Sequence, residues 1–306
     1  MAVYEQTYKP YTGPLTPEWS RFLIIPRHAL RGTFNSKLFA AFYVICFLPL
    51  LVELIMIYLR HNAGVLAAFS VNIRELVPVD AFFFQVFVNI QHSFAFLLAL
   101  LIGPPMVSRD LRNNALPLYL CRPFSRTEYV IGKMSVLVIL LSLVTWIPQL
   151  LLFFFQSYLE GFAWFKENLW IANSIVMAGL LWIFLLALLT QTISALVKWR
   201  VVASGALVAL FLIPSAFGLF INEIFNTLWG NIISPIASIT NVTAGLFGTF
   251  DRVGEVRQIR GWEGTVVREV VLLEPPLWVS WTVLFLICAV CLALLSWRVK
   301  AYEVVK

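Results

Sequence analysis

The sequence predicts an all-α membrane protein that crosses the bilayer six times. Of its 306 residues, 60% are hydrophobic and only 12% are charged, whereas soluble domains carry about 25% charged residues. So few charged side chains cannot cover a surface that faces water. A helix needs about 20 apolar residues to span a bilayer, and six runs reach that length. They are Leu38–Leu59, Ala81–Ile102, Met134–Phe155, Leu169–Val197, Val201–Ile221 and Leu277–Trp297.

The distribution of basic side chains predicts the orientation. With the N-terminus inside the cell, 15 of the 22 Lys and Arg fall on the cytoplasmic side, as the positive-inside rule requires. Orientation therefore accounts for the net charge of +6, and no nucleic-acid partner is expected. We expect an integral protein of a bacterial inner membrane, with the lipid bilayer as its surroundings and both termini in the cytoplasm.

Residues 1–37 are predicted to form a cytoplasmic tail followed by an interfacial helix. Residues 1–15 are polar and rich in turn formers, and Thr16-Pro17 is a helix-start signal. The apolar stripe that follows comprises Trp19, Phe22, Leu23, Pro26, Leu30 and Phe34, with Arg21, Arg27, His28 and Arg31 mostly off it. This pattern favours a helix lying in the headgroup region, divided in two by Pro26. The alternative is a disordered basic tail.

The cytoplasmic loop 103–133, between the second and third spans, is predicted to contain two helices. Ser108 is expected to cap a short helix, with Asp110 in its first turn, where the helix dipole favours negative charge. Pro117 is expected to end or bend that helix. Ser125 and Glu128 fit a capping box, so the second helix should run unbroken into the third span.

The external segment 222–276 is predicted to be partly helical. Gly230–Phe250 is long and apolar enough to cross the membrane, but a seventh span would place the basic C-terminal residues outside. A re-entrant or interfacial piece is therefore favoured. Asp251–Glu274 is interpreted as a small external subdomain in which Val266, Val267, Val270 and Val271 have helical spacing. The glycosylation sequon at Asn241 is interpreted as chance. Residues 38–306 as a whole are predicted to form the six-helix transmembrane domain, which includes the loop 103–133 and the segment 222–276.

Polar side chains inside the spans are the candidates for a translocation path. They are Glu53, Gln85, Asn89, His92 and Gln149. Three of them, on the second span, share one helix face. Because polar groups at membrane depth are costly, they either face a path for a polar or amphipathic substrate or form hydrogen bonds between helices. For Glu53 a further alternative is a carboxylate that reaches outward to the interface, since Arg60 lies only two turns away.

Sequence motifs for chemistry are missing. The Cys288-x-x-Cys291 pair lies in an apolar run without a neighbouring ligand, which favours packing side chains over a metal or redox site. There is no G-x-x-x-x-G-K-[ST] phosphate loop and no H-E-x-x-H. An energy source must therefore come from another polypeptide or from an ion gradient.

The run from Ser108 to Lys133, SRDLRNNALPLYLCRPFSRTEYVIGK, resembles the intracellular loop of permease subunits of type-2 ABC transporters. In that family an acidic-basic stretch after the second span is followed by Arg-Pro, Ser-Arg, an aromatic residue and Gly-Lys at the start of the third. The matching positions here are Asp110, Arg122-Pro123, Ser125-Arg126, Tyr129 and Gly132-Lys133. The six-span layout, the leading interfacial helix and the external segment before the last span are also similar.

The resemblance implies a half-transporter without catalytic residues. Two permease subunits, identical or not, would pair, and each would dock a separate ATP-binding cassette ATPase that holds the ATP and Mg²⁺. The segment Ser108–Leu116 would be the coupling helix. The residues implied in ATPase coupling are Ser108, Arg109, Asp110, Leu111, Arg112, Asn113 and Asn114. Those at the start of the third helix are Arg122, Ser125, Arg126, Glu128 and Lys133.

Three functional hypotheses follow. The first is a permease that exports its substrate by alternating access. The second is a membrane-embedded enzyme, such as a protease or lipid transferase, for which only Glu53 and His92 offer catalytic groups at membrane depth. The third is an ABC-like membrane subunit that anchors or signals, for example in envelope assembly, without transporting.

Overall fold

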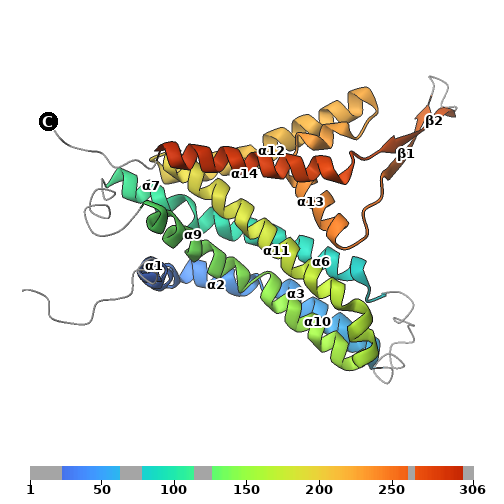
Figure 1. Cartoon of the computed structure of the whole chain (residues 1–306), viewed down its shortest axis with the longest axis horizontal. Coiled ribbons are helices and arrows are strands. Elements are labelled where there is room, and N and C mark those ends of the chain that lie inside the picture. Colours follow the sequence, from blue (N-terminus) through green and yellow to red (C-terminus); the bar gives the residue numbers. More distant parts are fainter. Residues whose placement is uncertain (1–22, 63–77, 114–125, 261–265, 299–306) are drawn as a thin grey trace, which may run out of the picture.

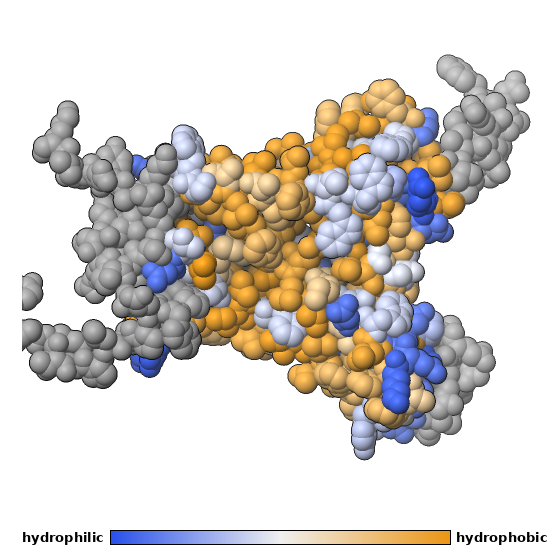
Figure 2. Space-filling model, in the orientation of Figure 1, coloured by the Kyte–Doolittle hydropathy of each residue, from blue (hydrophilic) through white to orange (hydrophobic). Residues whose placement is uncertain are grey.

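The computed structural model describes residues 23–62, 78–113, 126–260 and 266–298, which form a helical bundle with one β-hairpin (Figure 1). The prediction of six apolar spans is confirmed, because six helical segments are long and apolar enough to cross a membrane. They are Lys37–His61, Ala81–Ser108, Thr127–Glu160, Phe162–Leu196, Arg200–Phe225 and Leu277–Trp297. Figure 2 shows a broad hydrophobic band with hydrophilic residues gathered toward the two ends of the molecule.

The two ends of the bundle differ in charge. One end, called here the basic end, holds α1, α7 and the turn between α11 and α12, and the β-hairpin lies at the other (Figure 1). The described Lys and Arg of the basic end are Arg27, Arg31, Lys37, Arg109, Arg112, Arg126, Lys133, Lys198, Arg200 and Arg298. Among the described residues of that end, only Asp110 and Glu128 are acidic.

The amphipathic helix before the first span is present as α1, Ile24–Phe34. Arg27, His28 and Arg31 are exposed, while Ile25 and Leu30 contact the core beside α9. Pro26 lies in the first turn of α1, where a missing N–H costs no hydrogen bond. Whether Pro26 separates two helical pieces lies outside the described residues, which begin at residue 23.

The first and third spans are each broken near a proline. The first consists of α2, Lys37–Ile45, and α3, Leu48–His61, with Pro49 in the first turn of α3. The third consists of α9, Arg126–Ser142, and α10, Trp146–Glu160, with Pro148 in the first turn of α10. Pro49 lies one turn before Glu53 in the sequence and predicts a bend there, which the break between α2 and α3 confirms. The break in the third span was not predicted, since a single helix was expected over Met134–Phe155.

Gln91 on α6, Ala81–Ile102, joins the two breaks. Its Nε2 donates to the carbonyl oxygens of Cys46 (3.2 Å) and Val144 (2.7 Å). The Val144 carbonyl needs this donor because its helical partner, four residues on, would be Pro148, which has no N–H. One buried amide thus satisfies carbonyls at both breaks.

The helix α7, Pro104–Arg112, follows α6 after Gly103. A Cβ on Gly103 would clash with Thr190 Cγ2 on α11, so only glycine permits this close approach. The expectation that Ser108 caps a helix over 108–116 is wrong. Pro104 begins the helix, because proline is suited to the first helical position, and Ser108 lies inside it. Pro117 falls outside the described residues.

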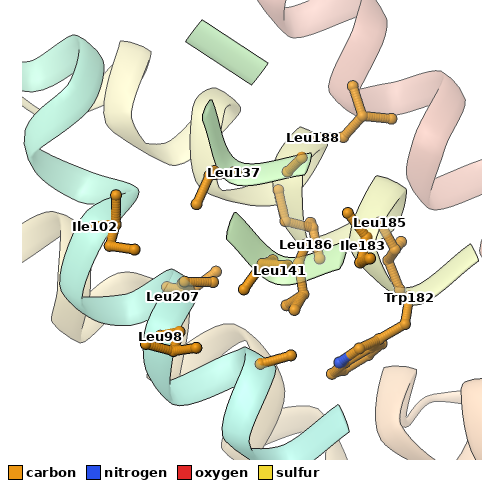
Figure 3. Close-up of a cluster of buried hydrophobic side chains, with 14 of the residues drawn as sticks. Leu98, Ile102, Leu137, Leu141, Trp182, Ile183, Leu185, Leu186, Leu188 and Leu207 are labelled. Carbon is orange, nitrogen blue, oxygen red and sulfur yellow. The ribbon is translucent and has the colours of Figure 1, made fainter. Parts of the chain in front are cut away.

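The centre of the bundle is α11, Phe162–Leu196, which contacts α6, α7, α9, α10, α12, α13 and α14. It is connected to α12, Arg200–Phe225, by a tight turn over residues 197–199. Leucines from α6, α9, α11 and α12 converge on one apolar cluster (Figure 3). A second apolar cluster lies beyond the helix breaks and includes Leu50, Phe84, Phe153 and Ile175. The two clusters therefore occupy opposite halves of the bundle.

The segment before the last helix does not form a seventh span. It contains the short η2, Trp229–Ile232, and α13, Pro235–Leu246. The 12 residues of α13 rise about 18 Å, which is less than the hydrocarbon thickness of about 30 Å. The Asn241 amide donates to Glu274 Oε2 (3.3 Å) and Thr243 is buried, so the sequon is engaged in packing.

The interpretation of residues 266–271 as helical is wrong. Val253–Arg260 and Val266–Leu273 are antiparallel strands β1 and β2 of a hairpin. Valine is β-branched and favours strands over helices, and this propensity outweighs the four-residue spacing. The last helix, α14, runs from Leu277 to Arg298 and contacts α11 and α13.

Candidate functional site

The start of the third span is fixed to α7 by a buried polar cluster, called here the α7–α9 joint. Lys133 Nζ lies 2.8 Å from Asp110 Oδ2, and the Tyr129 hydroxyl donates to the same oxygen at 2.7 Å. Tyr129 and Lys133 are four residues apart on α9 and therefore share one face. Both side chains of the ion pair are nearly buried, and Tyr129 is fully buried. A buried, charge-assisted contact of this kind holds two helices in one geometry.

On its other side, α7 is held by Ser194 of α11. The Ser194 hydroxyl accepts hydrogen bonds from the backbone N–H groups of Val107 (3.2 Å) and Ser108 (2.8 Å). It donates to the Pro104 carbonyl oxygen at 2.7 Å. Ser108 contributes no cap, since its own hydroxyl donates back to the same carbonyl. Two neighbouring helices therefore hold α7. Ser194 of α11 forms hydrogen bonds with three of its backbone groups, and α9 binds the side chain of Asp110.

The predicted coupling residues fall into two sets. Some are held by contacts inside the bundle, and others have exposed side chains. Asp110 faces inward to the joint and Ser108 is buried, so their coupling role stays a prediction, in which they act through these internal contacts. Arg112 and Asn113 are exposed at the end of α7. Arg109 and Leu111 lie on α7, but their side chains are outside the description, as are Asn114, Arg122 and Ser125 entirely.

The predicted second helix of the loop is confirmed as α9. It begins at Arg126 and runs through Lys133 into the apolar segment. Glu128 lies in its first turn, where the helix dipole favours an acidic side chain. The capping box itself depends on Ser125, which is not described. The end of the loop, from Arg126, and the third span are therefore one continuous helix as far as Ser142.

A pocket of ≈ 530 Å³ lies between α6, α11, α12 and α13, and is called here the α6 pocket. Two residues of the predicted polar face, Asn89 and His92, line it together with Ser93 and Thr240. The rest of its wall is apolar, chiefly aromatic and leucine side chains. Its volume falls within the range of about 300–1,000 Å³ typical of small-molecule sites.

His92 is the polar centre of the α6 pocket. It is 6% exposed, and its ring stacks at a tilt against Trp182 with centroids 5.4 Å apart. Trp182 Nε1 also donates to the His92 carbonyl oxygen at 2.8 Å. Among the described residues, His92 Nε2 has no hydrogen-bond partner. A buried ring nitrogen without a partner is a candidate contact for a bound molecule.

The other predicted path residues lie elsewhere. Gln149 Nε2 on α10 donates to Glu53 Oε2 on α3 at 2.9 Å, and both side chains are fully buried. The reading of Glu53 as reaching outward to the interface is therefore wrong, and helix–helix hydrogen bonding describes the pair. Gln85 accepts a hydrogen bond from Thr249. The five residues are thus distributed over three places instead of one path.

In the part of the chain that the structure describes, the candidate residues for metal, redox or acid–base chemistry are not joined to one another. No three His, Cys, Asp or Glu side chains there form a metal site, and Cys46, Cys288 and Cys291 are free. No hydrogen bond links His92 with Glu53, whose described partner is Gln149.

Sequence reasoning missed Ser194 and Gln91. Ser194 ends a polar run, T-Q-T-I-S, at residues 190–194 of an otherwise apolar span, and this run was the available signal. Gln91 lies off the face shared by the other polar residues of α6, and its role depends on two breaks in distant helices. No local pattern could have identified it.

Compared with models of known protein families and with curated proteins, the sequence gave no match. The similarity to type-2 ABC permeases therefore remains a resemblance in the 107–133 loop and in the order of the spans. What the structure establishes is a helical membrane protein with six candidate spans.

Proposed function

We propose that this chain is the permease subunit of a type-2 ABC transporter, which exports its substrate by alternating access driven by a separate ATPase subunit. The observation that carries this proposal is the α7–α9 joint. Asp110, Lys133 and Tyr129 tie α7 to a helix that continues into the third span. Closure of an ATPase can shift a membrane bundle only through contacts that differ between its states, and a firmly held α7 would transmit such a push.

The surface of α7 supports the same proposal. Arg112 and Asn113 are exposed, so they are accessible to a docked subunit. The basic end, to which α7 belongs, is the end that the positive-inside rule assigns to the cytoplasm, where ATP is available. The ATPase would hold ATP and Mg²⁺, and this chain would contribute no catalytic residue.

The α6 pocket is the candidate substrate site. Its mostly apolar wall and the unpartnered His92 Nε2 suit a largely apolar molecule with one hydrogen-bonding group. Ser93 is exposed on the same helix, within the membrane-spanning region. The Ser93 hydroxyl donates to the Asn89 carbonyl oxygen at 3.3 Å, and a second permease subunit packed against this side of α6 would cover it and complete the path.

The test is charge reversal on α7. The variant Arg109→Glu with Arg112→Glu is expected to insert into the membrane normally but to lose ATP-dependent transport in proteoliposomes containing the ATPase. A control variant, Arg27→Glu with Lys198→Glu, reverses two charges at the same end and is expected to transport normally. Unchanged transport by the α7 variant would refute the coupling role.

Two further outcomes concern the class of protein. Co-purification with an ATP-binding cassette subunit is expected, and its absence under mild detergent extraction would contradict the proposal. If the ATPase does bind but no transported compound ever stimulates ATP hydrolysis, a non-transporting role in envelope assembly or signalling replaces export.

A further inference from the structure

Another sizeable pocket, of ≈ 670 Å³, lies at the basic end and includes Asp110 and Lys133 of the α7–α9 joint in its wall. We call it the α1–α7 pocket, because α1 and α7 form two of its walls, with the start of α2, the end of α6 and Arg200 of α12. One part of its wall is apolar, formed by side chains such as Ile25, Phe39 and Ile102. The other part is polar and charged.

The charged groups that line this pocket are Asp110, Lys133 and Arg200, and the imidazole of His28 lines it with them. Asp110 Oδ2 already accepts from Tyr129 and pairs with Lys133, so its negative charge is compensated within the wall. Arg200 then adds a permanent positive charge. Ser36 caps the N-terminus of α2 at the pocket, and a helix N-terminus also favours an anion. The wall therefore has a net positive character.

The surroundings strengthen this character. Arg27 and Arg31 on α1 and Lys37 on α2 are exposed, and each is next in sequence to a residue that lines the pocket. Like charges gathered on one end of a molecule raise the local potential and concentrate anions there. The pocket lies where the amphipathic α1 meets the start of α2, and Figure 1 shows both elements at the basic end of the bundle.

We propose that the α1–α7 pocket binds an anionic phospholipid, with the phosphate against Arg200 and the positive wall and an acyl chain along the apolar wall. Basic pockets between membrane helices on the cytoplasmic side suit anionic headgroups. A lipid satisfies both halves of the wall, whereas a free phosphate would leave the apolar half in contact with water. The lipid would hold α1 against α9 at the membrane surface.

The experiment compares lipid retention by the purified full chain, measured by native mass spectrometry with phosphatidylglycerol and phosphatidylcholine of identical acyl chains. Wild type is expected to retain phosphatidylglycerol at about tenfold lower lipid concentration than phosphatidylcholine. Arg200→Gln should weaken phosphatidylglycerol retention about tenfold, as expected for the loss of a charge-assisted contact. Lys198→Gln removes an exposed charge two residues away, outside the pocket, and should change retention by less than about twofold.

His28→Asn, on the opposite wall, provides a second variant should Arg200→Gln fail to fold, and a several-fold weaker retention is expected. Equal effects of Arg200→Gln and Lys198→Gln would overturn the proposal, as would equal retention of the two lipids. Displacement of phosphatidylglycerol by millimolar inorganic phosphate alone would also overturn it, in favour of a free-anion site. The measurement needs no ATPase or transport, so its failure would leave the proposed permease function standing.

Discussion

Asp110 and Glu53 are both buried carboxyl groups, yet the bundle treats them differently. Asp110 has a cation and a hydroxyl donor, Lys133 and Tyr129, on the same oxygen. Glu53 receives one amide hydrogen bond from Gln149, and its Oε1 has no partner among the described residues. The first carboxyl therefore fixes the geometry of α7 on α9. The second is incompletely satisfied, and it lies beyond the helix breaks, in the half of the bundle formed by α3 and α10.

The comparison teaches that polar residues in a membrane bundle cannot be assigned a common role from their residue type. A buried carboxylate that has a cation and a hydroxyl donor, as Asp110 does, holds two helices rigidly. A buried carboxyl with a single hydrogen bond, as Glu53 has, holds two helices less rigidly. The following substitutions test this difference, beginning with the largest expected effect.

Lys133→Met should be the most destabilising change. It leaves the Asp110 carboxylate nearly buried without its cation, and breaking a buried pair from one side costs about 3–5 kcal/mol. The measurement is the free energy of unfolding in detergent, followed by circular dichroism. The double variant Lys133→Met with Asp110→Asn removes the orphaned charge and should recover more than half of the loss. A single variant as stable as wild type would show that the joint does not hold α7.

Gln91→Leu tests the link between the two helix breaks. It leaves the Cys46 and Val144 carbonyl oxygens without a donor, at an expected cost of about 2 kcal/mol in unfolding free energy. Asn89→Leu, two residues earlier on α6, is the control. Asn89 lines the α6 pocket and is only half-buried, so that variant should change stability by less than about 0.5 kcal/mol. Equal effects would contradict the bridging role of Gln91.

Tyr129→Phe removes one of the two donors to Asp110 while keeping the ring and the ion pair. The expected loss is about 1–2 kcal/mol, because the hydrogen bond is made to a charged acceptor. Tyr158→Phe, at a side chain that is 84% exposed, should be neutral. Thermal unfolding of the two variants side by side gives the comparison, and indistinguishable midpoints would deny the hydroxyl a role.

Glu53→Gln should have the smallest effect. The substitution is nearly isosteric and retains an acceptor for Gln149, so the unfolding free energy should stay within about 0.5 kcal/mol of wild type. Asp110→Asn, the matched change at the joint, should cost clearly more because it leaves Lys133 without its anion. If Glu53→Gln were the more damaging of the two, the contrast between the two carboxyls would be reversed.

The sequence predicted the parts of the fold that depend on local composition. Apolar length identified the six spans, and Pro49 predicted the bend in the first. Local signals gave a wrong helix start where a stronger signal lay nearby. Ser108 has the side chain of an N-cap, but Pro104 lies one turn earlier and begins the helix. The hairpin was not predicted, because the spacing of its valines indicates a helix whereas their β-branched side chains favour a strand.

Contacts between distant elements could not be predicted. Asp110 and Lys133 are 23 positions apart, and nothing in helical periodicity states that their side chains meet. Ser194 holds α7 only because α11 passes beside it. The α6 and α1–α7 pockets each draw on four or more elements, so they exist only once the bundle is assembled.

The most direct test of the account is a distance measurement between α7 and α9. Spin labels at Arg112→Cys and Thr127→Cys, both exposed, would be compared by pulsed electron paramagnetic resonance after replacement of Cys46, Cys121, Cys288 and Cys291. A firmly held α7 predicts a narrow distance distribution that Lys133→Met broadens. A broad distribution already present with Lys133 intact would contradict the claim that the joint fixes α7.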